Sequence, residues 1–217
     1  MLTRNKQIGN DGAPADSRLA ALRARAIDAV IEREQGYVND PHDHGGETNW
    51  GVTADVARAY GYHGPMAELP RALAASVFTD LYWHALSLDQ VGAISADIAA
   101  EMVDTAVNMG PGTAGQFLQR ALNSFNARAA LWPDLTVDGL VGPKTIGALT
   151  AYARRRARNG RKAMVAVMVA ALNCQQGARY LEITLGDPSQ ERFAFGWFRE
   201  RIAKPAITPS CSEPHPR

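Results

Sequence analysis

The chain has 217 residues, of which 46% are hydrophobic and 21% charged, and its formal net charge at pH 7 is +1. These values are typical of a globular protein with a full hydrophobic core, and they exclude a disordered, collagen-like or coiled-coil chain. The balanced charge gives no overall argument for binding nucleic acid.

The N-terminal residues 1–16 are polar and contain no apolar run that would serve as a secretion signal. The longest apolar stretch, residues 163–172, is too short to span a bilayer and predicts a buried helix. The two cysteines, Cys174 and Cys211, are too few for a disulfide framework. We therefore expect a soluble protein with two free thiols and no export signal of its own.

Hydrophobic periodicity predicts a mainly α protein with one small β-prone segment. Apolar residues at helical spacing run from Leu19 to Ile31, between a capping residue at position 16 or 17 and Gly36, where glycine commonly ends a helix. Residues 37–53 are rich in Gly, Asn, Asp and Thr, which favours a loop or a short β-hairpin. Later helices are expected over residues 54–60, 70–86, 94–109, 114–129, 144–158, 161–185 and 192–202.

The end of the first helix and the loop after it carry the residues best suited to acid–base chemistry. Glu34 is expected in the last helical turn, where the partial negative charge of the helix end disfavours a carboxylate. A neutral carboxylic acid is what a general acid needs. Asp43 follows in a polar, glycine-bearing loop that favours the ionised form. A proton donor that faces an ionised carboxylate across a cleft is the usual equipment for glycoside hydrolysis.

Residues 34–53, EQGYVNDPHDHGGETNWGVT, resemble the signature of glycoside hydrolase family 108, which is roughly E-G-G-Y-x-x-x-x-x-D-x-G-G-x-T-x-x-G-[IV]-T. This family consists of peptidoglycan-cleaving lysozymes (N-acetylmuramidases) that are frequent among bacteriophage endolysins. The resemblance implies that Glu34 is the catalytic acid, and it makes Asp43 and Thr48 the candidates for the second catalytic group. The chain departs from the pattern at Gln35, where the family usually has glycine. In the wider phage-lysozyme spacing, Thr48 comes one position early and Asn49 occupies the expected place.

Later segments carry the same resemblance. Tyr82 and Trp83, and Asn108 before the Gly110 break, look like later parts of the family, and residues 136–145, TVDGLVGPKT, are similar to the peptidoglycan-binding region that commonly follows it. The resemblance implies a lysozyme-like α+β catalytic region followed by a helical peptidoglycan-binding-like region packed on it. The expected divisions are a flexible N-terminal extension at 1–16, the catalytic region at 17–110, the binding region at 111–204 and a tail at 205–217.

Aromatic and amide side chains near the acid are candidates for holding the sugar. Flat aromatic faces stack on sugar rings, while amides and hydroxyls position hydroxyl groups or water. The residues expected to bind substrate are Tyr37, Asn39, Asn49, Trp50, Tyr82, Trp83 and Asn108. For Tyr82 and Trp83 core packing is an equally good interpretation, and Asp43 is equally well explained as a residue that stabilises its turn.

Two other clusters have simpler explanations. His42, Asp43 and His44 lack the remaining convergent ligands of a zinc site, so neither a metal nor a cofactor is expected. The basic run at 154–162 is best explained as a solvated helix end, and attraction to an anionic cell envelope is the alternative.

The resemblance therefore predicts a peptidoglycan hydrolase, a phage or prophage endolysin, that cleaves the β-1,4 bond between N-acetylmuramic acid and N-acetylglucosamine, and we expect it to be a monomer. Its expected partner is bacterial peptidoglycan, with neither nucleic acid nor membrane insertion. The alternatives are a lytic transglycosylase and a non-catalytic wall-binding or virion structural protein. The chain is expected to be made in the bacterial cytoplasm and to reach the wall after the membrane is permeabilised. A separation of the two carboxyl groups of about 5–5.5 Å would indicate a retaining mechanism, and about 6.5–9.5 Å an inverting one.

Overall fold

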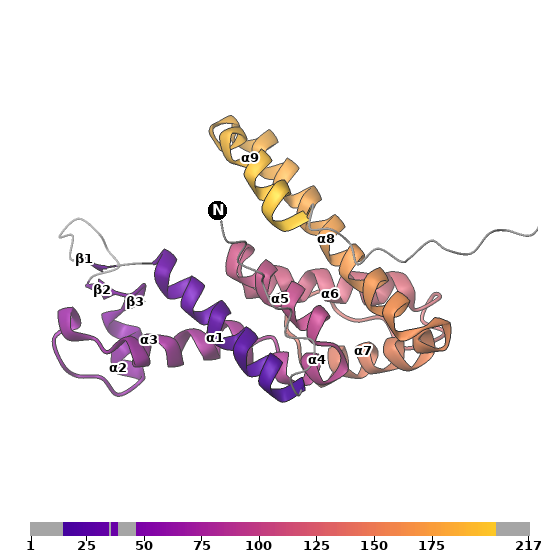
Figure 1. Ribbon diagram of the computed structural model, residues 1–217, viewed down its shortest axis with the longest axis horizontal. Coiled ribbons are helices and arrows are strands. Elements are labelled where there is room, and N and C mark those ends of the chain that lie inside the picture. The colour runs from indigo at the N-terminus through magenta and orange to yellow at the C-terminus, as the bar shows by residue number, and fades with distance from the viewer. Residues whose placement is uncertain (1–14, 35, 39–46, 203–217) are drawn as a thin grey trace, which may run out of the picture. The chain divides into compact units, whose positions relative to one another are not determined.

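The computed structural model describes residues 15–34, 36–38 and 47–202. The chain divides into two compact units, an N-terminal unit that ends at Thr79 and a C-terminal unit that begins at Asp80. Helices dominate both units, and the N-terminal unit also holds a small antiparallel sheet with the strand order β1-β2-β3 (Figure 1). This confirms the predicted mainly α, lysozyme-like α+β fold.

In the N-terminal unit, one long helix packs along a shorter one, and the sheet follows the long helix in the chain (Figure 1). The core between the two helices is apolar, and an ion pair of 2.6 Å between Arg71 and Asp28 links their surfaces. The elements are α1 (Ala15–Arg33), β1 (Tyr37–Val38), β2 (Thr48–Asn49), β3 (Val52–Thr53), α2 (Ala54–Ala59), the 3₁₀ helix η1 (Met66–Glu68) and α3 (Arg71–Phe78).

The sheet is short, and a glycine before β1 and a helix cap after β3 mark its two ends. In the antiparallel β1–β2 pair Tyr37 lies opposite Asn49, and in the β2–β3 pair Asn49 lies opposite Val52. Gly36 precedes β1 with a φ of +97°, a left-handed conformation that glycine adopts at low cost. Thr53 ends β3 and caps α2, because its hydroxyl accepts a hydrogen bond of 3.3 Å from the Val56 amide. The sheet is thus joined directly to helices on either side.

The C-terminal unit is a bundle in which α5 and α6 are packed together and α8 lies against both. Ser95 caps α5, and Gly110, with a φ of +88°, joins α5 to α6. Beyond the bundle, α9 runs back along the C-terminal half of α8 (Figure 1), and the Tyr180 and Trp197 rings stack with centroids 5.0 Å apart. The elements are the π-helix η2 (Thr79–His84, starting at the unit boundary), α4 (Leu88–Ile94), α5 (Ala96–Met109), α6 (Pro111–Phe125), α7 (Pro143–Arg156), η3 (Ala157–Asn159), α8 (Arg161–Gly186), η4 (Pro188–Gln190), α9 (Glu191–Trp197) and η5 (Phe198–Ile202).

Several helix boundaries differ from the predicted ones. The helix expected over 70–86 gives way to the π-helix at Thr79, which ends at His84, and the left-handed residue Ser87 precedes α4. The short helix α4 was not predicted. Ser95 ends α4 and caps α5, so the two are separate helices. The helix expected over 114–129 stops at Phe125. Local hydrogen bonds at these points override the hydrophobic period on which the sequence prediction rests.

Candidate functional site

Glu34 lies immediately after α1, at the helix end where the sequence places it. Its amide still donates to the carbonyl of Val30 at 3.1 Å, so the backbone of Glu34 continues the helical hydrogen-bond pattern. The side chain is 42% exposed, and its Oε1 accepts a hydrogen bond of 3.1 Å from Nε of Arg33. An exposed ion pair of this kind contributes at most about 1 kcal/mol. The described residues therefore leave the carboxyl group accessible instead of enclosing it among apolar side chains.

The turn between β2 and β3 packs against the stem of Glu34. Trp50 and Gly51, the two turn residues, have φ values of +53° and +74°, as a type I′ hairpin turn requires. A Cβ on Gly51 would lie 2.6 Å from Cβ of Glu34 and 3.3 Å from the Phe78 ring, so only glycine fits there. The bulky Trp50 is held in its unfavourable conformation by a hydrogen bond of 3.1 Å from its Nε1 to the Leu69 carbonyl. The turn thus fixes where the stem of the acid lies.

Two other predicted residues lie on the strands of the same sheet. Tyr37 in β1 is exposed, and its hydroxyl donates to Oε1 of Glu47 at 3.0 Å. Thr48 in β2 is partly exposed and pairs with Val38. The predicted residues Asn39 and Asp43 belong to the segment between these strands and lie outside the described residues. The structure therefore brings Tyr37, Thr48 and the Trp50 turn together in one small sheet that packs on Glu34.

Asn49 has a structural role. Its side chain is buried, and its Nδ2 donates to the carbonyls of Met66 at 2.8 Å and Ala67 at 3.2 Å. These bonds attach η1 to β2. They use the amide donors within the protein, and contact of Asn49 with substrate stays a prediction.

The remaining predicted residues belong to the C-terminal unit. Trp83 has no exposed surface, and its Nε1 donates to Asp89 at 2.9 Å, which favours the core packing that the sequence left open beside a sugar contact. Tyr82 is partly exposed beside it. Asn108 is partly buried in α5 and donates to the hydroxyl of Tyr180 in α8. Burial raises the pKa of Tyr180 to about 12, so this hydroxyl stays neutral and hydrogen-bonded across the physiological range.

A row of amides on α6 holds the loop that carries the TVDGLVGPKT motif. Gln119 and Asn123 lie four residues apart on one face of the helix, and Asn126 follows three residues later as its C-cap. Asn123 makes two bonds of 2.8 Å with the backbone of Leu135, and Asn126 donates to Asp134 at 2.6 Å. The loop backbone is thus paired with side chains in the way that a strand would be paired with a neighbouring strand.

The buried Gln119 is the centre of this arrangement. Its Nε2 donates to Oδ1 of Asp138 at 2.8 Å and to the Leu140 carbonyl at 3.0 Å, while its Oε1 accepts from the Gly139 amide at 2.8 Å. The hydrogen bond from Gln119, with that from the Leu140 amide, lowers the pKa of Asp138. The motif is therefore held in one conformation by a single side chain of the preceding helix.

The sequence analysis missed both of the residues that set these conformations. Gly51 stands in the family pattern, but only its contact with Glu34 shows why a glycine is needed there. Gln119 belongs to a polar row on an otherwise apolar helix face, and that break in the pattern is the signal that would have indicated a partner.

The basic run at 154–162 is only partly a solvated helix end. Arg154, Arg155 and Arg158 are exposed, but Arg161 donates to the Ile94 carbonyl at 2.6 Å. Over the described ranges there is no group of three His, Cys, Asp or Glu side chains that could hold a metal ion. Within the same part of the chain, no helix has the length and apolar character needed to cross a membrane.

Two family models match consecutive parts of the chain. Residues 27–110 match the family described as Glycosyl hydrolase 108, and residues 113–202 match a Predicted Peptidoglycan domain. Among solved structures, the chain is similar to the one titled "Structure of Brucella abortus SagA", with 20% identity and a TM-score of 0.45 over 87% of this chain and 99% of that chain. The search of curated proteins gave no match.

Proposed function

We propose that the chain is a glycoside hydrolase that cleaves the β-1,4 bond between N-acetylmuramic acid and N-acetylglucosamine of peptidoglycan, because residues 27–110 match the Glycosyl hydrolase 108 family and residues 113–202 match a Predicted Peptidoglycan domain. The observation that carries the proposal is the geometry of Glu34. Its stem is fixed between the end of α1 and Gly51, while its carboxyl group is exposed. A fixed but accessible acid is what proton donation to a glycosidic oxygen needs.

In the proposed reaction the carboxyl group of Glu34 donates its proton to the glycosidic oxygen. The bond from that oxygen to the anomeric carbon breaks, and positive charge develops on the sugar ring. On one path Asp43 stabilises this charge, and the ionised Glu34 then takes a proton from the attacking water. On the other path Asp43, together with Thr48, activates the water and takes that proton itself. In both cases the water oxygen bonds to the anomeric carbon. One product then carries a new reducing end, and the other carries the hydroxyl that Glu34 protonated.

The test is digestion of purified sacculi followed by mass spectrometry of the new glycan ends. A muramidase releases reducing N-acetylmuramic acid, and Glu34→Gln should abolish that release because the amide has no acidic proton to transfer to the glycosidic oxygen. Glu32→Gln is the matched control, since Glu32 is an exposed glutamate two residues earlier in α1. Anhydromuramic ends would identify a lytic transglycosylase instead, and binding of sacculi without new ends would identify a wall-binding protein.

We place this activity in an endolysin, in line with the phage lysozymes that the residue 34–53 segment resembles. Bacteria that express the protein should stay intact until chloroform opens the inner membrane, and should then lyse within minutes. Expression of Glu34→Gln provides the matched strain, which should survive the same treatment. Lysis without permeabilisation would contradict this placement while leaving the hydrolase activity in place.

A further inference from the structure

One face of α8 is apolar and exposed from end to end. Its residues are Ala163, Val167, Ala170, Cys174, Ala178, Leu181 and Leu185, and all seven are exposed. The three largest, Val167, Leu181 and Leu185, are 51%, 53% and 84% exposed. The opposite face of α8, with Met164, Met168, Leu172 and Tyr180, is the one buried in the bundle. A continuous apolar surface of this kind marks an interaction site. We call it the α8 face.

The spacing of the α8 face is symmetric about its middle residue. From Ala163 to Leu185 the steps are 4, 3, 4, 4, 3 and 4 residues, the same in either direction from Cys174. These steps average about 3.7 residues per turn, so the row stays on one side of a nearly straight helix for about 33 Å. A twofold interface uses the same surface on both partners. The α8 face therefore matches a second copy of itself in the antiparallel direction.

Side-chain sizes are complementary in that arrangement. With Cys174 on the twofold axis, Leu185 of one copy faces Ala163 of the other, and Leu181 faces Val167. Near the axis only Ala170, Ala178 and Cys174 meet, which lets the helices approach closely at the centre. Large residues thus lie opposite smaller ones at both ends of the face.

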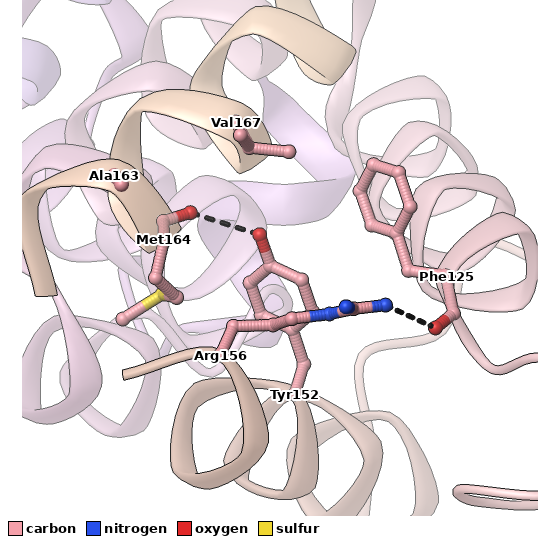
Figure 2. Close-up of a pocket in the computed structure, with 6 residues that line it drawn as sticks. All are labelled: Phe125, Tyr152, Arg156, Ala163, Met164 and Val167. Atoms are coloured by element: carbon pink, nitrogen blue, oxygen red, sulfur yellow. Dashed lines mark hydrogen bonds between the residues drawn. The ribbon is translucent and has the colours of Figure 1, made fainter. Parts of the chain in front are cut away.

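A pocket lies beside Ala163, the residue that Leu185 of the second copy would face. It has a volume of about 270 Å³, and Ala163 and Val167 of the α8 face form part of its wall (Figure 2). The other lining residues are Phe125, Tyr152, Arg156 and Met164. The Tyr152 hydroxyl donates to the Met164 carbonyl at 2.8 Å, and Arg156 is turned to the Phe125 carbonyl at 3.4 Å. The Tyr152 hydroxyl and the Arg156 guanidinium therefore bond to backbone carbonyls of the protein itself. The pocket accordingly suits an apolar leucine side chain better than a sugar.

Charge favours the antiparallel direction over the parallel one. The sequence has no acidic residue between Asp138 and Glu182, so the N-terminal end of α8, with Arg161 and Lys162, is basic. At its C-terminal end Glu182 is paired with Arg179 at 3.0 Å, and over residues 187–192, just beyond the helix, Asp187 and Glu191 outnumber the single cation Arg192, so this end carries a small excess of negative charge. An antiparallel pair brings these opposite charges together and also opposes the two helix dipoles, whereas a parallel pair would place like charges side by side.

We propose that two copies of this chain associate through the α8 face as an antiparallel, twofold-symmetric dimer with Leu185 of each copy in the pocket of the other. The dimer replaces the expectation of a monomer drawn from the sequence. It holds whether or not the proposed bond specificity is right, because it rests on the C-terminal unit alone.

The first test is the mass of the full chain in solution by sedimentation equilibrium. The wild type at micromolar concentration should show twice the 23.4 kDa of one chain, and Leu185→Glu should show the mass of a single chain. Phe195→Glu is the matched control, because Phe195 is 77% exposed on α9 but lies off the α8 face, and it should remain dimeric. Circular dichroism checks that each variant is folded. A wild-type chain that stays monomeric up to submillimolar concentration would overturn the proposal.

The second test reads the direction of the helices by cross-linking. In a Cys211→Ser background, mild oxidation should join Cys174 to its copy, and Leu185→Glu should prevent it. In a chain without Cys174 and Cys211, the pair Ala163→Cys with Leu185→Cys should form a covalent dimer, and neither substitution alone should do so. Self-linking through Leu185→Cys alone would indicate a parallel pair. A loss of sacculus binding on Leu185→Glu, with no change in mass, would assign the face to the wall. Either result would contradict the proposed dimer.

Discussion

The two units hold their functional loops in different ways. In the N-terminal unit, three short strands fix the Trp50–Gly51 turn, and the turn packs on Glu34 by direct contact. In the C-terminal unit, residues 126–142, all of them described, form no strand, and the amides of α6 bind their backbone instead. The first device depends on space for one missing Cβ, and the second on hydrogen bonds from one buried side chain. Steric changes should therefore damage the first, while the second should be sensitive to polar changes and, where Gly115 of α6 meets Gly139, also to steric ones.

Gly51→Ala breaks the N-terminal device and should have the largest effect. The new Cβ would collide with the stem of Glu34 at a position whose φ of +74° already disfavours alanine. A displacement of the Glu34 carboxyl group by about 1 Å should lower the rate of sacculus digestion roughly 100-fold. Gly61→Ala is the matched control, because Gly61 has a φ of +83° but no atom within 4 Å of a new Cβ. Equal rates for the two variants would show that the turn does not position Glu34.

Gln119→Leu breaks the C-terminal device. It keeps the size of the side chain but removes the bonds to Asp138, Gly139 and Leu140, and it leaves the Gly139 amide without its acceptor. We expect a loss of about 2 kcal/mol in the free energy of unfolding, together with weaker retention on sacculi. The control is Gln116→Leu, one turn earlier on α6, where the side chain makes only a long contact of 3.5 Å with Arg120. Chemical denaturation of both variants would decide, and equal stabilities would contradict the role of Gln119.

Two helical glycines allow the steric effect of a new Cβ to be measured separately from the gain in helix propensity that alanine brings. A Cβ on Gly115 of α6 would collide with the carbonyl of Gly139, whereas a Cβ on Gly147 of α7 meets nothing within 4 Å. Gly115→Ala should therefore destabilise the chain by at least about 1 kcal/mol. Gly147→Ala should stabilise it by about 0.5 kcal/mol, since alanine is the better helix former. Thermal unfolding compares them directly, and shifts of the same sign would contradict the close approach of α6 to the loop.

Asp138 gives the smallest effect and a pH signature. Hydrogen bonds to its carboxylate, first from Gln119, lower its pKa below the ordinary value of 3.8. A depressed pKa in the folded state gives stability that is present above the unfolded value and is lost as pH falls through the folded value. As pH is lowered below about 5, the free energy of unfolding should therefore fall less steeply for Asp138→Asn than for the wild type. Parallel acid limbs would show that the carboxylate does not anchor the loop.

Much of this architecture could be predicted from the sequence, because the helices follow a clear apolar period. The position of Glu34 at a helix end and the small hairpin after it came from local signals of the same kind. Trp83 could not be assigned by type alone, since a tryptophan on a helix serves equally as a core residue or a sugar platform. Its burial is decided by the packing of the C-terminal unit.

The loop after α6 shows why the remaining features could not be predicted. Ala127, Arg128 and Ala129 are all left-handed, a conformation that their residue types disfavour. Asn126 makes it possible, because its Oδ1 accepts from the Ala129 amide at 3.0 Å and its Nδ2 donates to Asp134. Such tertiary hydrogen bonds leave little trace in hydrophobic period or turn propensity. The role of Gln119 could not be predicted either, because its hydrogen-bond partners lie some twenty positions further along the chain.

The central proposal is that Glu34 performs the cleavage. The most direct measurement follows Glu34→Gln and the wild type on the same sacculi, with bound protein counted by co-sedimentation and new reducing ends counted chemically. We predict that the variant sediments with sacculi as fully as the wild type and releases no reducing ends. Release by the variant at the wild-type rate would contradict the account.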